Sequence, residues 1–413
     1  MIRQPIISVL GHVDHGKCVS ADTEIVLADG TVRQIKEIYD YYSSHIRSSE
    51  TDDGEILDLE KANLRILTLD KYGSIKPRNA SRLWKRRSDK LIEVSMNHGS
   101  KIKVTPEHPF FSLNKKGEVT KVRADKLSDG DFVLIPSKIP SPRISLKKYK
   151  QLLLLKLAES RDFLAFVTPE LSKELFNLSK EADKSKLLAN HLYDCFTHNR
   201  FRVCDIVYLA NGSIPLDKVY GAIHSIKFST TKRRASHRGS LMSLPHTESQ
   251  FTDAFYVLGA LWGDGTGGNA NLSNTEEDLI KEYQRAIKNS FGLSIRVYKQ
   301  RTTNCIANSG CKTFGNFISR VFDYPKKNKS HTITVPDLIQ ASPNKFLSAF
   351  ISGYFDTDAH VSKRTNVEMV SVSPDMIKKL SILLQRFGCP STVIRSPRGY
   401  RLNISGADYL KHF

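Results

Sequence analysis

The chain has 413 residues, more than a single hydrophobic core usually serves, so we expect two or more domains. Lysine and arginine number 62 against 43 acidic residues, a formal net charge of +19, which favours nucleic acid as a partner over the alternative of a merely solvated basic surface. The short apolar run at the start has no cleavage site after it, and the six cysteines are scattered, so we expect a cytoplasmic protein with reduced thiols and no membrane contact.

In chain order, the first predicted element is a short buried strand over residues 6–10 that ends at Gly11. From Cys18 to about Pro136, short β-rich runs alternate with turn residues, which predicts an all-β domain over 18–140. The predicted turns lie at Ala28-Asp29-Gly30, Tyr72-Gly73, Asn97-His98-Gly99 and Asp129-Gly130.

Prolines and lysines near residue 140 mark a domain boundary. Residues 146–190 are predicted to be helical, and 200–250 mix short strands with a basic segment at 232–238. From 251 onward two similar units follow, each with a helix that ends in an acidic residue, so we expect an internal duplication in an α/β (α+β) region over 251–413.

A phosphate-loop pattern, G-x-x-x-x-G-K, directly follows the first strand and could cradle phosphates with its backbone N–H groups. The pattern next needs a serine or threonine, but Cys18 stands there and no helix follows, so we expect poor nucleotide binding by this chain. A glycine-rich turn with a chance lysine is the alternative. The residues concerned are Gly11, Asp14, His15, Gly16 and Lys17.

The longer string IRQPIISVLGHVDHGK, residues 2–17, resembles the opening of the GTPase domain of the translation initiation factors that join initiator tRNA to the ribosome (the bacterial factor two and eukaryotic factor five B family). A threonine would follow Lys17 in that family. The resemblance implies that residues 1–17 are a host segment, that its loop binds GTP only after splicing, and that ribosome and initiator tRNA are partners of the spliced host.

Three motifs carry a second resemblance: CVSADTEIVLADG from Cys18, GSKIKVTPEHPFF at 99–111 and VRADKLSDGDFVLIP at 122–136. Together they resemble the blocks of an intein, a Hint-type self-splicing element, and this likeness extends from Cys18 to the end of the chain. We expect the C-terminal splicing blocks, a histidine and a terminal asparagine, to be absent here, so that the chain could form a thioester but could not ligate its flanks.

Cys18, Thr105 and His108 are the predicted acyl-transfer residues. A thiolate is a strong nucleophile near neutral pH, so Cys18 can attack the carbonyl of Lys17. His108 can protonate the departing nitrogen, while Thr105 can hold the oxyanion or strain the bond. The resemblance implies the same roles. Taken singly, each residue could instead be an ordinary buried or strand residue.

VLGALWGDG at 257–265 and ISGYFDTDA at 351–359 resemble the two LAGLIDADG motifs of homing endonucleases. Small residues in both helices imply close helix packing, which would bring Asp264 and Asp358 together. Two such carboxylates need a cation, and Mg²⁺ suits oxygen ligands. The resemblance implies a monomeric endonuclease for double-stranded DNA; two unrelated amphipathic helices are the alternative. The small residues are Gly259, Ala260, Ser352 and Gly353.

Several positions depart from that family. Asp356 is a weaker candidate, because Trp262 takes the corresponding place in the first motif, and Ala359 replaces the final glycine. Thr334 stands where the family usually has a lysine; Lys327 or Lys329 could substitute.

The remaining basic and metal-ligand patterns are weaker. Segments 85–87, 232–238 and 326–329 are the predicted phosphate contacts, within an accessory DNA-recognition region at 141–250 and its neighbours. The spacing of His191, Cys195, His198 and Cys204 fits none of the common zinc patterns. Two other interpretations stay open: a nucleotide-binding translation GTPase with an inert insertion, and a DNA-binding module with inactive catalytic sites.

Overall fold

A computed structural model of the chain describes residues 18–52, 54–70, 73–188, 192–229, 240–266, 271–299, 305–362 and 366–410. The predicted phosphate-loop residues Gly11 to Lys17, the segment 232–238 and His191 lie outside this part. The chain forms two compact units: unit 1 takes residues up to Pro142 and from Val361 onward, and unit 2 takes Arg143–His360. Within the described ranges, no helix has the length and apolar character needed to cross a membrane.

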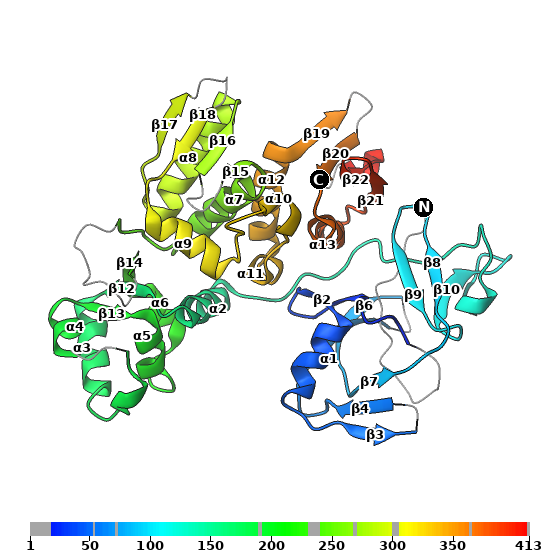
Figure 1. The fold of residues 1–413 in the computed structure, drawn as a ribbon, viewed down its shortest axis with the longest axis horizontal. Helices are drawn as coiled ribbons and strands as arrows, with labels where there is room; N and C mark the ends of the chain where they lie inside the picture. Colours follow the sequence, from blue (N-terminus) through cyan, green and yellow to red (C-terminus); the bar gives the residue numbers. More distant parts are fainter. Residues whose placement is uncertain are drawn as a thin grey trace. The chain divides into compact units, whose positions relative to one another are not determined.

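The first part of unit 1 consists mainly of short antiparallel strands (Figure 1). The predicted turns at Asp29-Gly30 and His98-Gly99 are confirmed, because Val26 pairs with Val32 and Ser95 pairs with Lys101 across them. The strands are β1 (Glu24–Val26), β2 (Val32–Gln34), β3 (Ser49–Thr51), β4 (Gly54–Asp58), β5 (Arg65–Leu69), β6 (Ile75–Asn79), β7 (Arg82–Arg86), β8 (Ile92–Ser95), β9 (Lys101–Val104), β10 (Pro109–Leu113) and β11 (Val119–Arg123).

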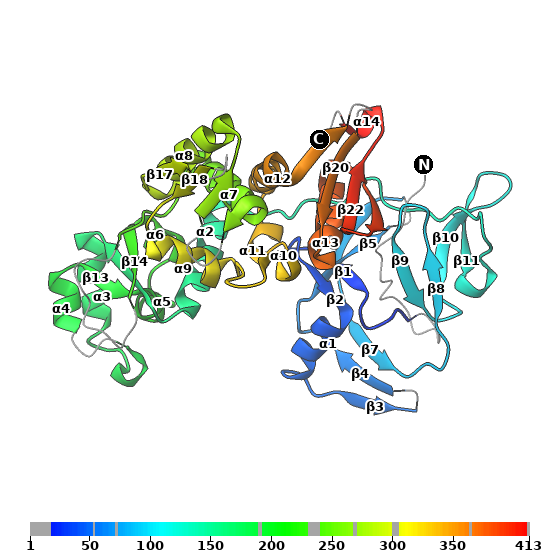
Figure 2. The same ribbon diagram turned by 45° about the horizontal axis from the view of Figure 1, so that its top comes forward.

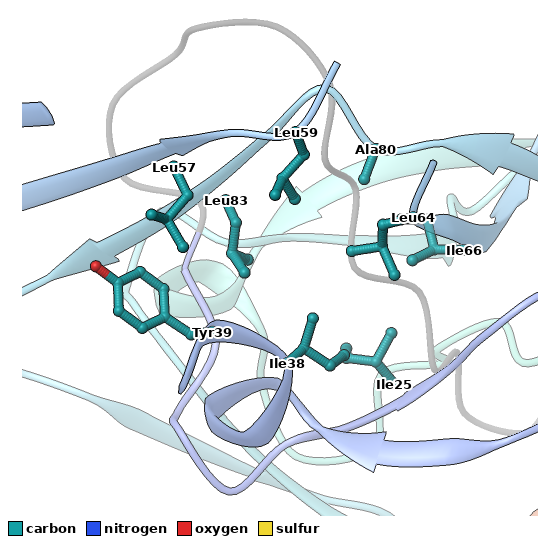
Figure 3. Close-up of a cluster of buried hydrophobic side chains, with 9 residues drawn as sticks. All are labelled: Ile25, Ile38, Tyr39, Leu57, Leu59, Leu64, Ile66, Ala80 and Leu83. Carbon is teal, nitrogen blue, oxygen red and sulfur yellow. The ribbon is translucent and has the colours of Figure 1, made fainter. Parts of the chain in front are cut away.

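One helix, α1 (Ile35–Ser43), interrupts this β-rich part, so the all-β prediction was incomplete. Its sequence IKEIYDYYS places Ile35, Ile38, Tyr39 and Tyr42 at the spacing of one helical face. Ile38 and Tyr39 are buried and join a hydrophobic cluster with side chains from the surrounding strands (Figure 3). The other members of that cluster lie on the strands or next to their ends, and they are Ile25, Leu57, Leu59, Leu64, Ile66, Ala80 and Leu83.

The strand predicted after Asp129-Gly130 is reduced to a single bridge between Ser112 and Val133. Val133 is buried, but its neighbour Phe132 is 62% exposed and Pro136 has no N–H to extend a ladder. That prediction was therefore too long.

In unit 2, the first region combines helices with the three-stranded sheet β13-β12-β14. The helical prediction over 146–190 was wrong at β12 (Phe163–Val167), whose residues are almost all buried. Consecutive residues of this strand are buried, so both faces of the sheet are covered there and the apolar run is continuous. The other elements are α2 (Leu146–Glu159), α3 (Pro169–Leu178), α4 (Leu192–Thr197), β13 (Arg200–Arg202), α5 (Val203–Ala210), α6 (Leu216–Gly221) and β14 (Ile223–Phe228).

From residue 248 the element order repeats, which confirms the predicted duplication. Each repeat runs helix, strand, strand, helix, strand, strand, and the sheets have matching orders, β15-β16-β18-β17 and β19-β20-β22-β21. The first repeat comprises α7 (Glu248–Asp264), β15 (Gly265–Thr266), β16 (Asn271–Asn274), α8 (Glu277–Phe291), β17 (Arg296–Lys299) and β18 (Cys305–Asn308).

Three helices, α9 (Lys312–Val321), α10 (Lys329–Thr332) and α11 (Asp337–Gln340), join the repeats. In unit 1, α13 packs on the strands β20, β21 and β22 (Figure 2). The second repeat comprises α12 (Asn344–Asp358), β19 (Ala359–Ser362), β20 (Asn366–Ser371), α13 (Pro374–Leu384), β21 (Thr392–Ser396) and β22 (Gly399–Ile404), and α14 (Ala407–Leu410) follows it.

Within unit 2, helices α7 and α12 pack against each other (Figure 1). A Cβ atom on Gly259 would overlap the Phe350 carbonyl and lie 2.8 Å from the Tyr354 nitrogen, and one on Gly353 would lie 2.9 Å from the Ala260 nitrogen. Glycine is thus required for this close approach. Ser352, which the sequence placed at the same contact, is instead exposed.

Candidate functional site

Cys18 and Thr105 lie directly opposite each other at the start of the strand-rich part of unit 1. The next residues along, Val19 and Val104, form an antiparallel bridge. The Cys18 N–H donates to Thr105 Oγ1 at 3.1 Å, and the Thr105 N–H donates to the Cys18 carbonyl at 3.0 Å. The threonine hydroxyl therefore contacts the nitrogen of the Lys17–Cys18 peptide bond.

His108 reaches the same place through a tight turn. Its N–H donates to the Thr105 carbonyl at 3.0 Å, and its ring packs edge-on against Phe110, 5.4 Å between centroids. The side chain is 6% exposed. Burial lowers the pKa of His108 to about 4, while the Cys18 backbone acts in the opposite direction. The imidazole is thus neutral at neutral pH, next to the cysteine.

The thiol of Cys18 is half-buried, and burial raises its pKa. Arg86, the last residue of β7, partly offsets this by lowering the same pKa. The guanidinium of Arg86 also stacks on Trp84, 5.3 Å from the ring centroid. Sequence reasoning placed Arg86 only among phosphate contacts; its proximity to Cys18 follows from tertiary structure and has no local sequence signal.

The second candidate site lies where α7 and α12 end. The C-terminal residues of these helices are Asp264 and Asp358, as the sequence predicted. Asp264 accepts a hydrogen bond from Asn274 Nδ2 at 2.5 Å. Asp358 lies against the last turn of α7, because a Cβ atom on Gly263 would be 3.3 Å from its Cγ. The structure therefore brings both carboxylates to one end of the helix pair.

The pKa values of both carboxyl groups are raised. For Asp264 the cause is burial, opposed by Asn274 and Lys329. For Asp358, desolvation of the carboxylate followed by the charge of Asp264 raises the pKa to about 6, although part of the side chain is exposed. Two neighbouring carboxylates, one of which disfavours ionisation of the other, form a fitting pair of oxygen ligands for a divalent cation.

Lys329 completes this site. Its ammonium donates to the carbonyl oxygens of Leu261 at 3.0 Å and Gly265 at 2.9 Å, and also to that of Gly263. Burial lowers the pKa of Lys329 to about 8, while Asp358 and Asp264 act to raise it. Of the two lysines considered from sequence, Lys329 is at the site and Lys327 is exposed.

The nearby positions that depart from the LAGLIDADG pattern also have structural explanations. The carbonyl of Thr334 accepts a hydrogen bond from Trp262 Nε1 at 2.9 Å, so this residue contributes its backbone to the fold around the site. Asp356 accepts a hydrogen bond from the Tyr256 hydroxyl at 3.0 Å and is exposed. Asn274, which holds Asp264, was missed, because ten residues separate the two in the sequence.

Within the described ranges, no group of three or more His, Cys, Asp or Glu side chains is arranged to hold a metal ion. Cys195 and Cys204 are half-buried, and burial raises the pKa of both thiols, which disfavours the thiolate form that binds zinc.

Two family models match the chain. The family model described as the intein splicing domain matches residues 25–337. The chain belongs to the intein splicing-domain family. A second model, described as a LAGLIDADG-like domain, matches residues 345–413, so this intein also carries a homing-endonuclease domain.

Curated relatives of this intein match almost the whole chain. They include elongation factor 2 of Methanopyrus kandleri, 31% identical over 98% of this chain and 32% of that protein, and a probable translation initiation factor IF-2 of Methanocaldococcus jannaschii, 28% identical over 100% and 33%. A probable IF-2 of Pyrococcus horikoshii is 34% identical over 100% of this chain and 27% of that protein. The chain thus spans about a third or less of the length of these relatives.

Two solved structures are also similar. The TvoVMA intein is 30% identical with a TM-score of 0.27, covering 29% of this chain and 70% of that one. The homing endonuclease I-DmoI, as mesophilic variants, is 17% identical with a TM-score of 0.31, covering 40% of this chain and 94% of that one.

Proposed function

We propose that the intein begins self-processing by an N–S acyl shift at Cys18. The sulfur attacks the carbonyl carbon of Lys17, a C–S bond forms, and the C–N bond between Lys17 and Cys18 breaks. The thiol loses a proton and the new amine of Cys18 gains one, so atoms and charge balance. Residues 1–17 are then held as a thioester, which an added thiol releases.

In this proposal His108 moves the proton and Thr105 acts on the nitrogen. A neutral imidazole can carry the thiol proton to the departing amine; the low pKa of His108 disfavours uptake of that proton but makes the imidazolium a strong acid for its delivery to the nitrogen. The Thr105 hydroxyl, at 3.1 Å, keeps the Cys18 nitrogen in place while its bond to Lys17 breaks. The sequence predicted that this hydroxyl holds the oxyanion or strains the bond; its hydrogen bond to the Cys18 nitrogen favours a role on the leaving group.

The observation that carries this proposal is the convergence of Cys18, Thr105 and His108 through two backbone hydrogen bonds and one side-chain hydrogen bond. Thiol-induced release of residues 1–17 can be followed by mass spectrometry in His108→Ala and in a matched control, His45→Ala, an exposed histidine. We expect release to fall about 100-fold or more in His108→Ala and to stay unchanged in His45→Ala. Equal release from both variants would contradict the role of His108.

We also propose that residues 1–17 are the first part of the GTPase domain of a translation initiation factor. The support is the resemblance of residues 2–17 and the printed names of two relatives. After splicing, Gly11, Asp14, His15, Gly16 and Lys17 bind GTP, and the host acts with initiator tRNA and the ribosome. Fluorescent GTP should not bind measurably to this chain, because Cys18 replaces the required hydroxyl; micromolar binding would favour an intact nucleotide site.

For the endonuclease, we propose that Asp264 and Asp358 hold Mg²⁺ and cleave double-stranded DNA at the uninterrupted host gene. The bound ion would supply charge stabilisation and an activated water at the scissile phosphates. Lys329 offsets negative charge beside the two carboxylates. Support comes from the carboxylate pair, the LAGLIDADG-like match and, for I-DmoI, a structure described as a complex with DNA and Mn.

Cleavage of a plasmid carrying the uninterrupted gene tests this assignment. Asp264→Asn and Asp358→Asn should abolish cutting while gel-shift affinity for the same DNA is kept. Asp356→Asn is the matched control, because this acid is exposed and bonded to Tyr256. If Asp356→Asn stopped cutting while Asp358→Asn still cut DNA, the metal-binding role would belong to Asp356 and not to Asp358.

Basic residues outside the acid pair complete the proposed DNA interface. Residues 141–250 form an accessory DNA-recognition region, and segments 85–87, 232–238 and 326–329 contact phosphates in a monomeric endonuclease, a proposal that the net charge of +19 supports. These contacts can be measured from the slope of log DNA affinity against log salt concentration. Each lysine removed should reduce the magnitude of this slope by about one.

A further inference from the structure

Lys329 reaches the acid pair from an irregular segment. It is the first residue of α10, a helix of only 4 residues, and the residue before it, Asn328, has φ +50. Such a short helix does not fix its own position. The three carbonyl oxygens that receive the ammonium all belong to the end of α7 and the residue after it. Something must therefore hold residues 324–334 against α7.

Trp262 holds the C-terminal end of residues 324–334 in place. Its side chain is 1% exposed, and its Nε1 donates to the Thr334 carbonyl at 2.9 Å. The ring lies edge-on against Tyr324, 4.9 Å between centroids, and against Phe350 of α12 at 5.9 Å. Trp262 lies two residues before Asp264. Its hydrogen bond to Thr334 therefore joins residues 324–334 to the last turn of α7, which ends at Asp264.

Tyr324 holds the N-terminal end of residues 324–334 in place. Its hydroxyl donates to the Leu261 carbonyl at 3.2 Å, and its side chain is 3% exposed. The same carbonyl accepts from Lys329 Nζ at 3.0 Å, and that nitrogen is 6.0 Å from the centroid of the Tyr324 ring. The lysine is thus enclosed between a segment tied at both ends and the last turn of α7.

We propose that Trp262 and Tyr324 are positioning residues that hold the Lys329 ammonium beside Asp264 and Asp358, and that they act on DNA cleavage through this lysine. The second part rests on the proposed endonuclease function. Trp262 occupies the place that Asp356 takes in the second motif, so the two motifs use this position differently: one acid bonds across the helix pair to Tyr256, and one indole anchors the lysine segment.

Amine labelling of the full chain without DNA tests the positioning directly. With mass-spectrometric readout and a small acylating reagent at about pH 10.5, where the amines of both lysines are at least half unprotonated, Lys329 should react at least about tenfold more slowly than the exposed Lys327, because its nitrogen is half-buried among three carbonyl oxygens. Tyr324→Phe keeps the same ring, Trp262→Phe keeps a smaller aromatic ring, and each removes one hydrogen-bond donor. Both should speed labelling of Lys329 several-fold and leave Lys327 unchanged. Unchanged Lys329 labelling in both variants would overturn the proposal, whatever happens to cleavage.

A double-mutant cycle on DNA cleavage tests the second part. We expect Tyr324→Phe to lower kcat with KM for DNA unchanged, and to have little further effect in a Lys329→Met background. A residue with only a structural role would instead lower kcat by the same factor in both backgrounds, and that result would refute action through the lysine. If no variant, nor the parent, cut DNA, the endonuclease proposal would fail while the labelling result still decided the positioning.

Discussion

Replacing Gly259 with alanine should destabilise unit 2, although alanine normally stabilises a helix by about 1 kcal/mol relative to glycine. In the structure, the added methyl group would overlap the backbone carbonyl of Phe350 and lie 2.8 Å from the Tyr354 nitrogen, both on α12. Backbone atoms cannot move aside as a flexible side chain can, so the helices must separate. Overpacking costs about 1–3 kcal/mol, and overlap with backbone atoms puts this site in the upper part of that range, so the cost exceeds the gain in helix propensity by about 1–2 kcal/mol.

The net loss should lower the melting temperature of a unit of this size by about 2–8 °C. In a Trp84→Phe background, Trp262 of α7 is the sole tryptophan and reports on this helix pair by fluorescence. Ser352→Ala is the matched control, because Ser352 is exposed on α12. This variant should melt within about a degree or two of the parent. A Gly259→Ala protein that melts at or above the parent temperature would refute the close-packing argument.

Three further outcomes follow from the charges at the two sites. Because the pKa of Asp358 is raised to about 6, its ionised form opposes folding above that pH; Asp358→Asn should melt higher than the parent at pH 8 without metal and equal to it near pH 3, and equal melting at both values would contradict the shift. His108 has its pKa lowered from 6.5 to about 4, so unit 1 should lose up to about 3 kcal/mol as the pH falls through this range. Urea unfolding followed by Trp84 fluorescence should show a flatter profile for His108→Gln, and an unchanged slope would exclude a buried neutral imidazole. Chelation with EDTA should stop DNA cleavage and Mg²⁺ should restore it, whereas cleavage in excess chelator would remove the metal from the proposal.

The sequence was most informative where a local pattern sufficed. The apolar spacing that ends in Asp264 and Asp358 predicted both helix ends, and Gly259 and Gly353 predicted their close approach, because a glycine within an apolar helix has few other uses. The spacing of Thr105 and His108 likewise predicted residues that one tight turn brings together.

Other features depended on contacts between distant segments. The choice of Lys329 over Lys327 requires the Tyr324 and Trp262 contacts, which no periodicity reveals. Strand β12 resembled a helix because both of its faces are buried, so its sequence shows no alternation of apolar and polar residues. Helix α1 was missed because short strands surround it and its apolar face spans only nine residues.

The initiating chemistry rests on one sulfur atom, and mass spectrometry of the Cys18→Ala protein after thiol treatment measures its role. The parent chain should shed residues 1–17, while Cys18→Ala should remain intact under the same conditions. Cys204→Ala, another half-buried thiol, should behave as the parent. Equal release of the leader from Cys18→Ala and the parent would contradict an acyl shift at this residue.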